Sequence, residues 1–487
     1  MMFGLKDIIS CRILLASIAI FLLSGSLSAL DWPVFPDSAI HRIGNSYGQY
    51  QNYGSKSYYH PGIDIMAPAG TPVYAVKSGY VKAVLTISAE LHWRVAIGDS
   101  AGAAECDGWL YAHLDEKSIA ANEGDRVEAG DFLGNLVEWP TAEFHHLHFV
   151  KIRHSGVTWD SDWQFIGNPL DELDNIPDHD APVFENVMDG QPLAFCRNES
   201  DDFFEEGEAL NGPVDIVARI YDYINHPEWK LSPYKIEYKI EGDTLIDWTP
   251  VVTFSGELDY DHAIDVLFRE DECCGSQSDY DNRVFYFNLT NTDSDSLIEI
   301  SDRTESWKTG YFHNGDYTVS VRASDRAGNA TTIQMPVAIE NYSDFEGIIV
   351  FEDGRPFNSG VEIAVTPDGQ TISADKDGKF ALTVGGGWQN IRITCPGYQT
   401  IDTTLLMNNN CQLLVTLPPV NFVRADANFD GRFNIADAAH IINYVFFDGH
   451  APEPYLAGDV NHDASVNIAD ASLIIESIFE NRSELAY

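Results

Sequence analysis

Short strand-like segments separated by glycine and proline recur along most of this chain, and they leave little room for long helices. Between Ser57 and Ser155, stretches such as "APAGTPVYAVKSGYVKAVL" place turn residues between short apolar segments and show no long helical period. This pattern predicts a β-rich domain. Because a domain usually holds about 100–200 residues, a chain of 487 residues is expected to divide into about three to five domains.

The start of the chain has the order of a secretory signal peptide. Lys6 and Arg12 come before or at the edge of an apolar run from Ile13 to Leu23, and small residues follow before Asp31. The run is shorter than the roughly 20 residues that a membrane span needs. The expectation is therefore a secreted or cell-surface protein, extracellular or periplasmic, with no membrane insertion after the signal is cleaved.

The charge balance limits the classes of partner. The chain carries 75 acidic and 29 basic residues, a formal net charge of −46. Such a charge repels nucleic acid and anionic membrane surfaces, so no nucleic-acid partner is expected. It suits calcium binding.

Cysteines allow disulfides if the protein is exported. The preferred pair is Cys395 with Cys411, because they flank one predicted strand pair, and free buried thiols are the alternative. Spacing alone does not determine connectivity. Six cysteines follow the signal segment: Cys106, Cys196, Cys273, Cys274, Cys395 and Cys411.

Two histidine-containing segments form the candidate catalytic site. In "HPGID", His60 and Asp64 are four residues apart, and "HHLHF" contains His146 and His148. Zinc favours imidazole nitrogen and carboxylate oxygen, and a catalytic zinc site has three protein ligands and a fourth position for water. His60, Asp64 and His148 would provide this set. On a strand His146 and His148 point to the same side, so His146 would reach water or substrate.

These residues, with His113 in "YAHL", resemble the lysostaphin-type family of zinc endopeptidases, peptidase family M23, over about residues 50–160. The resemblance implies one catalytic zinc ion held by His60, Asp64 and His148. It implies that His113 and His146 are the catalytic residues, which handle protons and stabilise the oxyanion. The implied reaction is hydrolysis of peptide crosslinks in bacterial peptidoglycan. A lone histidine is usually an ordinary packed or exposed side chain, but five matching positions in this order favour a site.

The loop before HLH departs from the family, which usually has a loop rich in glycine and serine or threonine there. This chain has "LVEWPTAEFH", in which Trp139 and Pro140 would reshape the groove wall and Glu138 or Glu143 would recognise a substrate amine. Ordinary loop residues are the alternative. His145 is either a spare ligand or a residue at the surface or outside the ligand set. Strand alternation favours the second interpretation, because it points His145 away from the side of His146. Three further histidines lack motif context and are expected to be structural: His41, His92 and His154.

Two central regions have the strand spacing of β-sandwiches. From Val183 to Asn341, alternating segments are separated by turn residues, and "GDYTVSVRASDRAGN" resembles the closing hairpin of immunoglobulin-like or fibronectin-like modules. From Phe345 to Val420, the segments resemble the carboxypeptidase regulatory-like domain. Structural spacers without sites of their own are the plain interpretation of both, and surface docking is an alternative for the second.

An internal duplication ends the chain. "DANFDGRFNIAD" and "DVNHDASVNIAD" begin 33 residues apart. Each has oxygen-bearing side chains at positions one, three, five, nine and twelve, which suits a calcium loop, and position seven would offer its backbone carbonyl. The first predicted calcium site comprises Asp426, Asn428, Asp430, Arg432, Asn434 and Asp437. The second comprises Asp459, Asn461, Asp463, Ser465, Asn467 and Asp470.

Each loop leads into an apolar helical stretch, and the tandem resembles a dockerin. The resemblance implies two structural calcium ions and a cohesin-like receptor, contacted through Ile435, Ala436, Ile468 and Ala469. A calcium-stabilised terminal domain without a partner is the alternative. Ala464 replaces the glycine expected at position six of the second loop, so weaker binding is expected there.

The predicted architecture is multidomain and mainly β: an antiparallel β-rich lysostaphin-type peptidase domain, two β-sandwich domains and a small α-helical dockerin-like calcium domain. Two alternatives to a wall hydrolase remain: a catalytically inactive wall-binding or regulatory protein, and a scaffolded protease acting on other proteins. The expected segments are a signal peptide at 1–29, the peptidase domain at 30–178 with its core at 50–160, the sandwiches at 180–342 and 343–420, and the calcium domain at 421–487.

Overall fold

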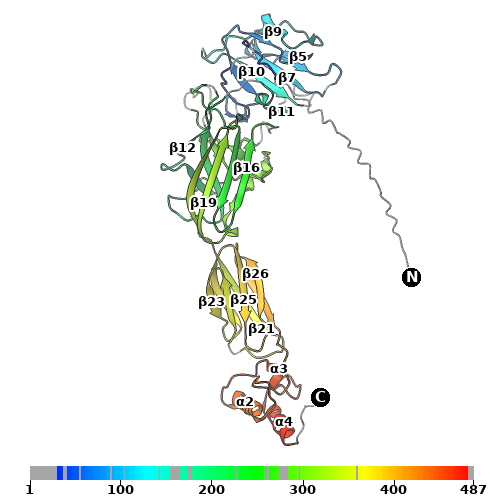
Figure 1. Ribbon diagram of the computed structural model, residues 1–487, viewed down its shortest axis with the longest axis vertical. Coiled ribbons are helices and arrows are strands. Elements are labelled where there is room, and N and C mark those ends of the chain that lie inside the picture. The colour runs from blue at the N-terminus through cyan, green and yellow to red at the C-terminus, as the bar shows by residue number, and fades with distance from the viewer. Residues whose placement is uncertain are drawn as a thin grey trace, which may run out of the picture.

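The chain forms four units that follow one another from the N-terminal to the C-terminal end (Figure 1). The computed structural model is mainly β, with antiparallel sheets and few helices, as predicted. We name the units by their residues: first unit 30–173, second unit 178–341, third unit 342–420 and fourth unit 421–480. The structure describes residues 30–36, 41–53, 56–87, 90–103, 105–141, 143–153, 165–173, 178–224, 226–227, 229–256, 258, 263–273, 283–295, 297–357 and 360–480.

The predicted signal peptide at 1–29 lies outside these residues. In the part of the chain that the structure describes, no helix is long and apolar enough to cross a membrane.

The first unit is built on one antiparallel seven-stranded sheet in the order β11-β10-β7-β6-β5-β8, with β3 also paired to β10. The central strands β7 and β10 are buried on both faces, which requires apolar side chains in both directions. Two short ribbons, β1-β2 and β4-β9, flank the sheet. The strands are β1 Tyr50–Gln51, β2 Tyr58–Tyr59, β3 Ile63–Met66, β4 Pro72–Tyr74, β5 Gly79–Thr86, β6 Trp93–Gly98, β7 Gly108–Leu114, β8 Arg126–Val127, β9 Phe132–Asn135, β10 His146–Ile152 and β11 Ile166–Gly167.

The second unit has two antiparallel sheets. One centres on β14, which pairs with four other strands, and the other has the order β16-β15-β19-β20. The elements are β12 Val183–Glu185, β13 Leu193–Arg197, β14 Pro213–Tyr221, β15 Lys235–Glu241, β16 Ile246–Thr253, α1 Ile264–Leu267, β17 Tyr286–Asn288, β18 Trp307–Lys308, β19 Gly315–Ser324 and β20 Ala330–Ile339. One buried apolar cluster runs from Trp32 to Ile339, so the first and second units share a core.

The third unit also has two sheets, β24-β21-β27 and β23-β22-β25-β26, around its own buried cluster. Its strands are β21 Tyr342–Phe351, β22 Glu362–Thr366, β23 Gln370–Ser373, β24 Lys379–Gly385, β25 Trp388–Thr394, β26 Ile401–Leu406 and β27 Cys411–Leu417. Strand β27 runs parallel to β21, and all other pairings are antiparallel.

The preferred disulfide between Cys395 and Cys411 is wrong, because both thiols are free. Cys395 follows β25 in one sheet, whereas Cys411 begins β27 in the other. The two cysteines therefore do not flank a strand pair. Cys106 and Cys196 are also free, and Cys274 lies outside the described residues.

The fourth unit packs α2 against α4 around a small apolar cluster. Asn434 and Asn467 cap the two helices, each accepting a hydrogen bond from the backbone two residues on. The helices are α2 Ile435–Phe446, α3 Tyr455–Gly458 and α4 Ile468–Phe479. Short 3₁₀ helices elsewhere are η1 Glu90–His92, η2 Glu116–Ser118, η4 Pro169–Asp171, η6 Ile300–Thr304 and η7 Thr309–Tyr311.

Three buried carboxyl groups meet where the chain enters the second unit. Oxygens of Asp178, Asp222 and Asp325 lie within 4.8 Å of one another. Burial, helped by neighbouring carboxylates, raises the pKa of Asp222 to about 8 and that of Asp178 to about 6. The amide of Asn329 donates to Asp178 O at 2.9 Å and to Asp325 Oδ2 at 2.6 Å, and so joins the entering segment to the β19–β20 turn.

The close packing of the first unit on the second gives a stability prediction. Gly48 has φ +74°, and a Cβ there would lie 2.1 Å from Phe254 Cδ1 across the junction, whereas Gly70 has φ +79° and open space around it. Left-handed backbone costs an alanine about 1–2 kcal/mol. Gly70→Ala should lose only this amount, and Gly48→Ala should lose a further ~1–3 kcal/mol through overpacking. Denaturant unfolding of both variants measures the difference, and equal losses would contradict the packing.

The carboxyl cluster gives a pH prediction. Because the pKa of Asp222 is raised from about 3.9 in the unfolded chain to about 8, the folded state binds more protons in this window. Stability should therefore fall as the pH rises from about 4 to 8. Asp222→Asn, facing Asp178, Asp180 and Asp325, should flatten that fall. Denaturant unfolding across this range in EDTA tests it, with exposed Asp189→Asn as the control. A profile unchanged by Asp222→Asn would refute the assignment.

Candidate metal centre and active site

Two histidines and one aspartate converge at the junction of β3 and β10. The antiparallel register places His148 opposite Asp64, and His60 comes just before β3. A Cβ at Gly62 would lie 2.4 Å from Phe149 O, so glycine allows "HPGID" to lie close against β10. The fold thus brings together ligands 84 residues apart in sequence.

The three candidate ligand atoms are almost equidistant. Asp64 Oδ1 lies 3.2 Å from His60 Nε2 and 2.9 Å from His148 Nδ1, and the two nitrogens are 3.1 Å apart. A tetrahedron with metal–ligand bonds of about 2.0–2.1 Å has edges of about 3.3 Å. The donor set of two imidazoles and one carboxylate therefore fits three corners of a zinc tetrahedron. All three side chains are largely buried.

Hydrogen bonds orient the ligands from behind. His60 Nδ1 lies 3.0 Å from Ser46 O, so the proton on Nδ1 is donated to the carbonyl and Nε2 faces the site without one. Asn45 Nδ2 donates to Asp64 Oδ2 at 2.5 Å, which leaves Oδ1 toward the histidines. These contacts fix both the tautomer of His60 and the rotation of the Asp64 carboxylate.

Burial and mutual charge set the ionisation of the ligands. Burial opposes ionisation of Asp64, but the charges of His60 and His146 and the hydrogen bond from His148 together hold its pKa well below the usual value. Burial lowers the pKa of His148 to about 4. An ionised Asp64 and a neutral His148 are in the protonation state that binds a metal ion.

The two predicted catalytic histidines lie beside the ligands. Their rings are 4.7 Å apart, and His146 Nε2 lies 3.7 Å from Asp64 Oδ2. His113 Nδ1 lies 2.8 Å from Leu91 O, and His146 Nδ1 lies 2.8 Å from Phe144 O. Since each Nδ1–H donates to a carbonyl, each Nε2 is the free base. Burial lowers the pKa of both side chains, that of His113 well below its usual value.

The backbone of His113 has an unusual conformation. Its φ is +68°, and it is the extra residue where the β6–β7 register shifts between Trp93 and Arg94. Such a bulge re-aims one side chain, at a cost in backbone strain that clusters at functional sites. It directs the His113 ring toward His146 and His148, with ring centroids 4.7 and 5.8 Å away.

A cavity of about 460 Å³ opens above these side chains. Trp139 forms one wall and packs its ring 4.5 Å from His113 and 4.9 Å from His146. Its backbone N–H donates to His145 Nδ1 at 2.9 Å, so His145 holds the loop and is not placed at the metal centre. Pro140 also lines the cavity, whereas the two glutamates considered for amine recognition are exposed and do not: Glu138 and Glu143.

Three contributors to the site were not recognised from the sequence. His92, expected to be structural, lines the cavity with its ring 5.4 Å from His113 and 5.8 Å from Trp139. Asn45 and Ser46, which hold the ligands, lie in no recognisable motif. Of the other histidines expected to be structural, His41 packs on Trp32 away from the cavity, and His154 lies outside the described residues.

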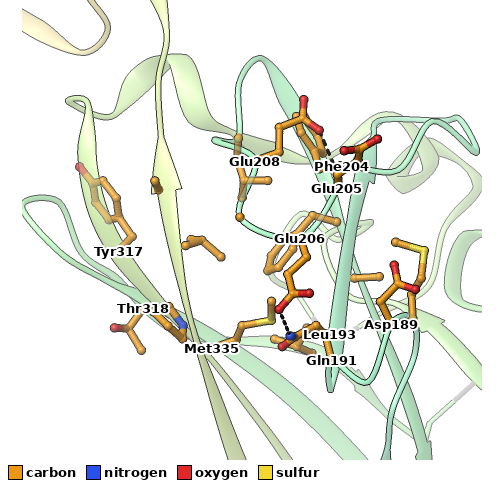
Figure 2. A pocket seen from close by; sticks show the side chains of 18 of the residues that line it. Asp189, Gln191, Leu193, Phe204, Glu205, Glu206, Glu208, Tyr317, Thr318 and Met335 are labelled. Carbon is orange, nitrogen blue, oxygen red and sulfur yellow. Dashed lines mark hydrogen bonds between the residues drawn. The ribbon is translucent and has the colours of Figure 1, made fainter.

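Another cavity, of about 520 Å³, lies in the second unit (Figure 2). Apolar residues such as Leu193, Phe204 and Met335 form its floor. Glutamates stand at its rim, and Glu206 accepts a hydrogen bond from Gln191 at 2.9 Å. No histidine or cysteine is among the described residues that line it. Of these two cavities, the one in the first unit is lined by the cluster of imidazole and carboxylate side chains.

The two C-terminal loops have the same internal arrangement. Asp426 accepts from the N–H groups of Asp430 and Gly431, and Asp459 accepts from those of Asp463 and Ala464, at 2.9–3.2 Å. Position six is left-handed in both loops, with φ +78° at Gly431 and +65° at Ala464. The remaining predicted calcium residues take part in the same turns: Asn428, Arg432, Asn434 and Asp437, and Asn461, Ser465, Asn467 and Asp470.

Comparisons with known proteins found similarity over part of the chain. Glycyl-glycine endopeptidase ALE-1 of Staphylococcus capitis is 31% identical over 120 residues, which are 24% of this chain and 30% of that protein's length. A catalytic-domain mutant of the prophage-encoded M23 protein EnpA of Enterococcus faecalis is 27% identical, over 27% of this chain and 90% of that one, with a TM-score of 0.21. The catalytic domain of lysostaphin of Staphylococcus simulans is 24% identical, over 28% and 93%, with a TM-score of 0.22.

The family match covers the candidate ligands and the histidines beside them, but not Asn45 and Ser46, which form hydrogen bonds with the ligands. Residues 58–161 match Peptidase family M23, and this stretch contains the three candidate metal ligands and both histidines beside them. The first unit is therefore similar to Peptidase family M23 over these residues.

Proposed function

We propose that this protein is a secreted zinc metalloendopeptidase that hydrolyses peptide crosslinks of bacterial peptidoglycan. The observation that carries the proposal is the triangle of His60 Nε2, Asp64 Oδ1 and His148 Nδ1, with edges of 2.9–3.2 Å. It lies within the stretch matched by the peptidase family. An inactive wall-binding protein would have no need of a complete ligand set.

The residues of the site divide the work of hydrolysis. The chemistry that zinc supplies, when bound by His60, Asp64 and His148, is Lewis-acid activation of a water molecule and of the scissile carbonyl. The free Nε2 of His146 accepts the proton of the attacking water. The proton taken up by the His113–His146 pair makes an imidazolium that donates a hydrogen bond to the developing oxyanion, and this proton passes to the leaving amine nitrogen when the C–N bond breaks. Burial keeps both imidazoles neutral beforehand, so each is ready to accept a proton.

The substrate is proposed from the similarity to the Staphylococcus capitis protein and from the shape of the cavity. The Staphylococcus capitis protein is named as a glycyl-glycine endopeptidase, and its similarity lies in the peptidase domain. Trp139 stands over the paired histidines and narrows the cavity, which suits an extended peptide with small side chains. Proteins attacked by a scaffolded protease are the alternative substrate.

In this proposal, the other three units position the peptidase domain relative to an anchoring point. The second and third are β-sandwiches, immunoglobulin-like and carboxypeptidase regulatory-like, which hold the active site away from the anchoring point. The fourth is a dockerin-like module with two structural calcium ions and a cohesin-like receptor. Its support is the duplicated loop with matching hydrogen bonds from Asp426 and Asp459. Secretion is inferred from the N-terminal segment, which lies outside the described residues.

Removing one ligand should separate metal binding from turnover. His60→Ala or Asp64→Ala should abolish both zinc retention and activity, because two ligands hold a catalytic zinc ion poorly. His146→Ala should retain zinc and lose about 10²–10⁴-fold in kcat, the usual contribution of a general base. His41→Ala, away from the cavity, is the control. Zinc content and digestion of purified peptidoglycan are the measurements, and full activity of His60→Ala would disprove the ligand assignment.

The substrate is tested by mass spectrometry of the fragments released from peptidoglycan, with soluble peptides digested in parallel. Cleaved crosslinks are the expected result. Cleavage of soluble peptides alone would defeat the wall assignment and favour the scaffolded protease.

The calcium loops should respond to exchange of glycine and alanine at position six. Gly431→Ala should weaken the first site and Ala464→Gly should strengthen the second, each by roughly five- to thirtyfold, because left-handed backbone costs alanine about 1–2 kcal/mol. Isothermal titration calorimetry of the full chain gives both affinities. Absence of calcium binding in the unmodified protein would end the proposal for this unit.

A further inference from the structure

A short segment of the first unit lies between the metal ligands and the second unit. We call residues 44–49 the clasp. Four backbone hydrogen bonds of 2.8–3.0 Å join it to the ligand segment: Gly44 N to Asp64 O, Asp64 N to Asn45 O, His60 N to Gln49 O, and Gly48 N to His60 O. The backbone of His60 and Asp64 is therefore held in register by the clasp, outside the main sheet.

The clasp also holds the ligand side chains. Ser46 O accepts from His60 Nδ1, and Asn45 Nδ2 donates to Asp64 Oδ2. Gln49 fixes both contacts in turn, because its Nε2 donates to Asn45 Oδ1 at 3.0 Å and its Oε1 accepts from Ser46 N at 3.2 Å. A shift of the clasp would thus turn both an imidazole and a carboxylate of the metal centre.

The opposite side of the clasp is held by the second unit. Arg283, 1% exposed, donates from Nη1 to Gly44 O at 2.5 Å and to Lys230 O at 3.2 Å. The backbone N–H of Ser232 donates to Ser46 Oγ at 3.2 Å. Tyr47 OH donates to Gly256 O at 2.6 Å. One end of the clasp, Gly44, and its middle, Ser46 and Tyr47, therefore contact residues that are 186 or more positions later in the chain.

We infer that the second unit helps to position the metal ligands. Arg283 is a positioning residue that acts through the clasp on His60 and Asp64. The inference rests on the proposed function, since it takes these two side chains as metal ligands. Groups that orient metal ligands by hydrogen bonds typically change metal affinity or activity by about 10–100-fold when removed. A spacer would leave the metal centre unaffected.

The junction offers a matched control. Arg326 of the second unit donates from Nε to Asp171 Oδ1 at 3.1 Å and from Nη2 to Asp171 O at 2.8 Å. It joins the same two units but contacts no residue of the clasp through these bonds. Arg326→Gln therefore weakens the junction and leaves the path to the metal ligands intact.

The experiment compares Arg283→Met with Arg326→Gln in the full chain. Zinc affinity is measured by competition with a chelator, beside kcat, KM and thermal unfolding. Arg283→Met should bind zinc about tenfold more weakly, with a lower kcat and little change in KM, and Arg326→Gln should match the unmodified protein in zinc affinity. Equal zinc affinity in all three proteins, or equal weakening in both variants, overturns the inference.

A milder variant decides the matter if Arg283→Met fails to fold. Tyr47→Phe removes one hydroxyl from the junction and should weaken zinc binding at least about threefold, as expected for a lost hydrogen bond. Unchanged zinc affinity then overturns the inference. Failure of the unmodified protein to bind zinc is a different result, because it rejects the proposed function itself.

Discussion

The pairing of β3 with β10 is the constraint on which the rest of the active site depends. Its register places Asp64 opposite His148, so that a carboxylate and an imidazole from distant parts of the chain meet at 2.9 Å. A slip by one residue would turn every side chain of one strand to the other face. The buried apolar neighbours Ile63, Ile65 and Leu147 oppose such a slip, because it would take them out of the apolar core and turn them toward the polar ligands. The core of the first unit thereby specifies the geometry of the candidate metal centre.

Strain and burial then adjust what the histidines can do. The bulge at His113 is maintained because β6 and β7 pair regularly on both sides of it, which compensates for a left-handed residue without glycine. Both catalytic candidates use Nδ1 to bind a backbone carbonyl, so their tautomer is set by main-chain atoms. The arrangement keeps two bases side by side without charge, which the low polarity of the pocket favours over two imidazolium ions.

The residues proposed to bind metal and to react could be selected from the sequence, because two motifs each place a pair of them close together. HxxxD places His60 and Asp64 four residues apart, HLHF places His146 and His148 two residues apart, and strand alternation gives the second pair a common direction. The partners that hold them could not be found in this way. Asn45, Ser46 and Arg283 are identified only by hydrogen bonds across the fold, and nothing in their neighbourhood in sequence marks them. The failed pairing of Cys395 with Cys411 has the same origin, since sheet membership is not a local property.

The contacts between units are of two types, a shared apolar core and a polar contact, and the type determines whether two units unfold together. The first and second units share one buried core, whereas the third and fourth each have their own. Where the fourth meets the third, a buried ion pair joins Arg355 to Glu453 at 2.6 Å, and Asp353 accepts from Tyr455 N. Such a polar joint is specific in geometry, because breaking it would leave a buried charge without compensation. A shared apolar core instead makes the first two units cooperative in unfolding, so the metal centre inherits the stability of both.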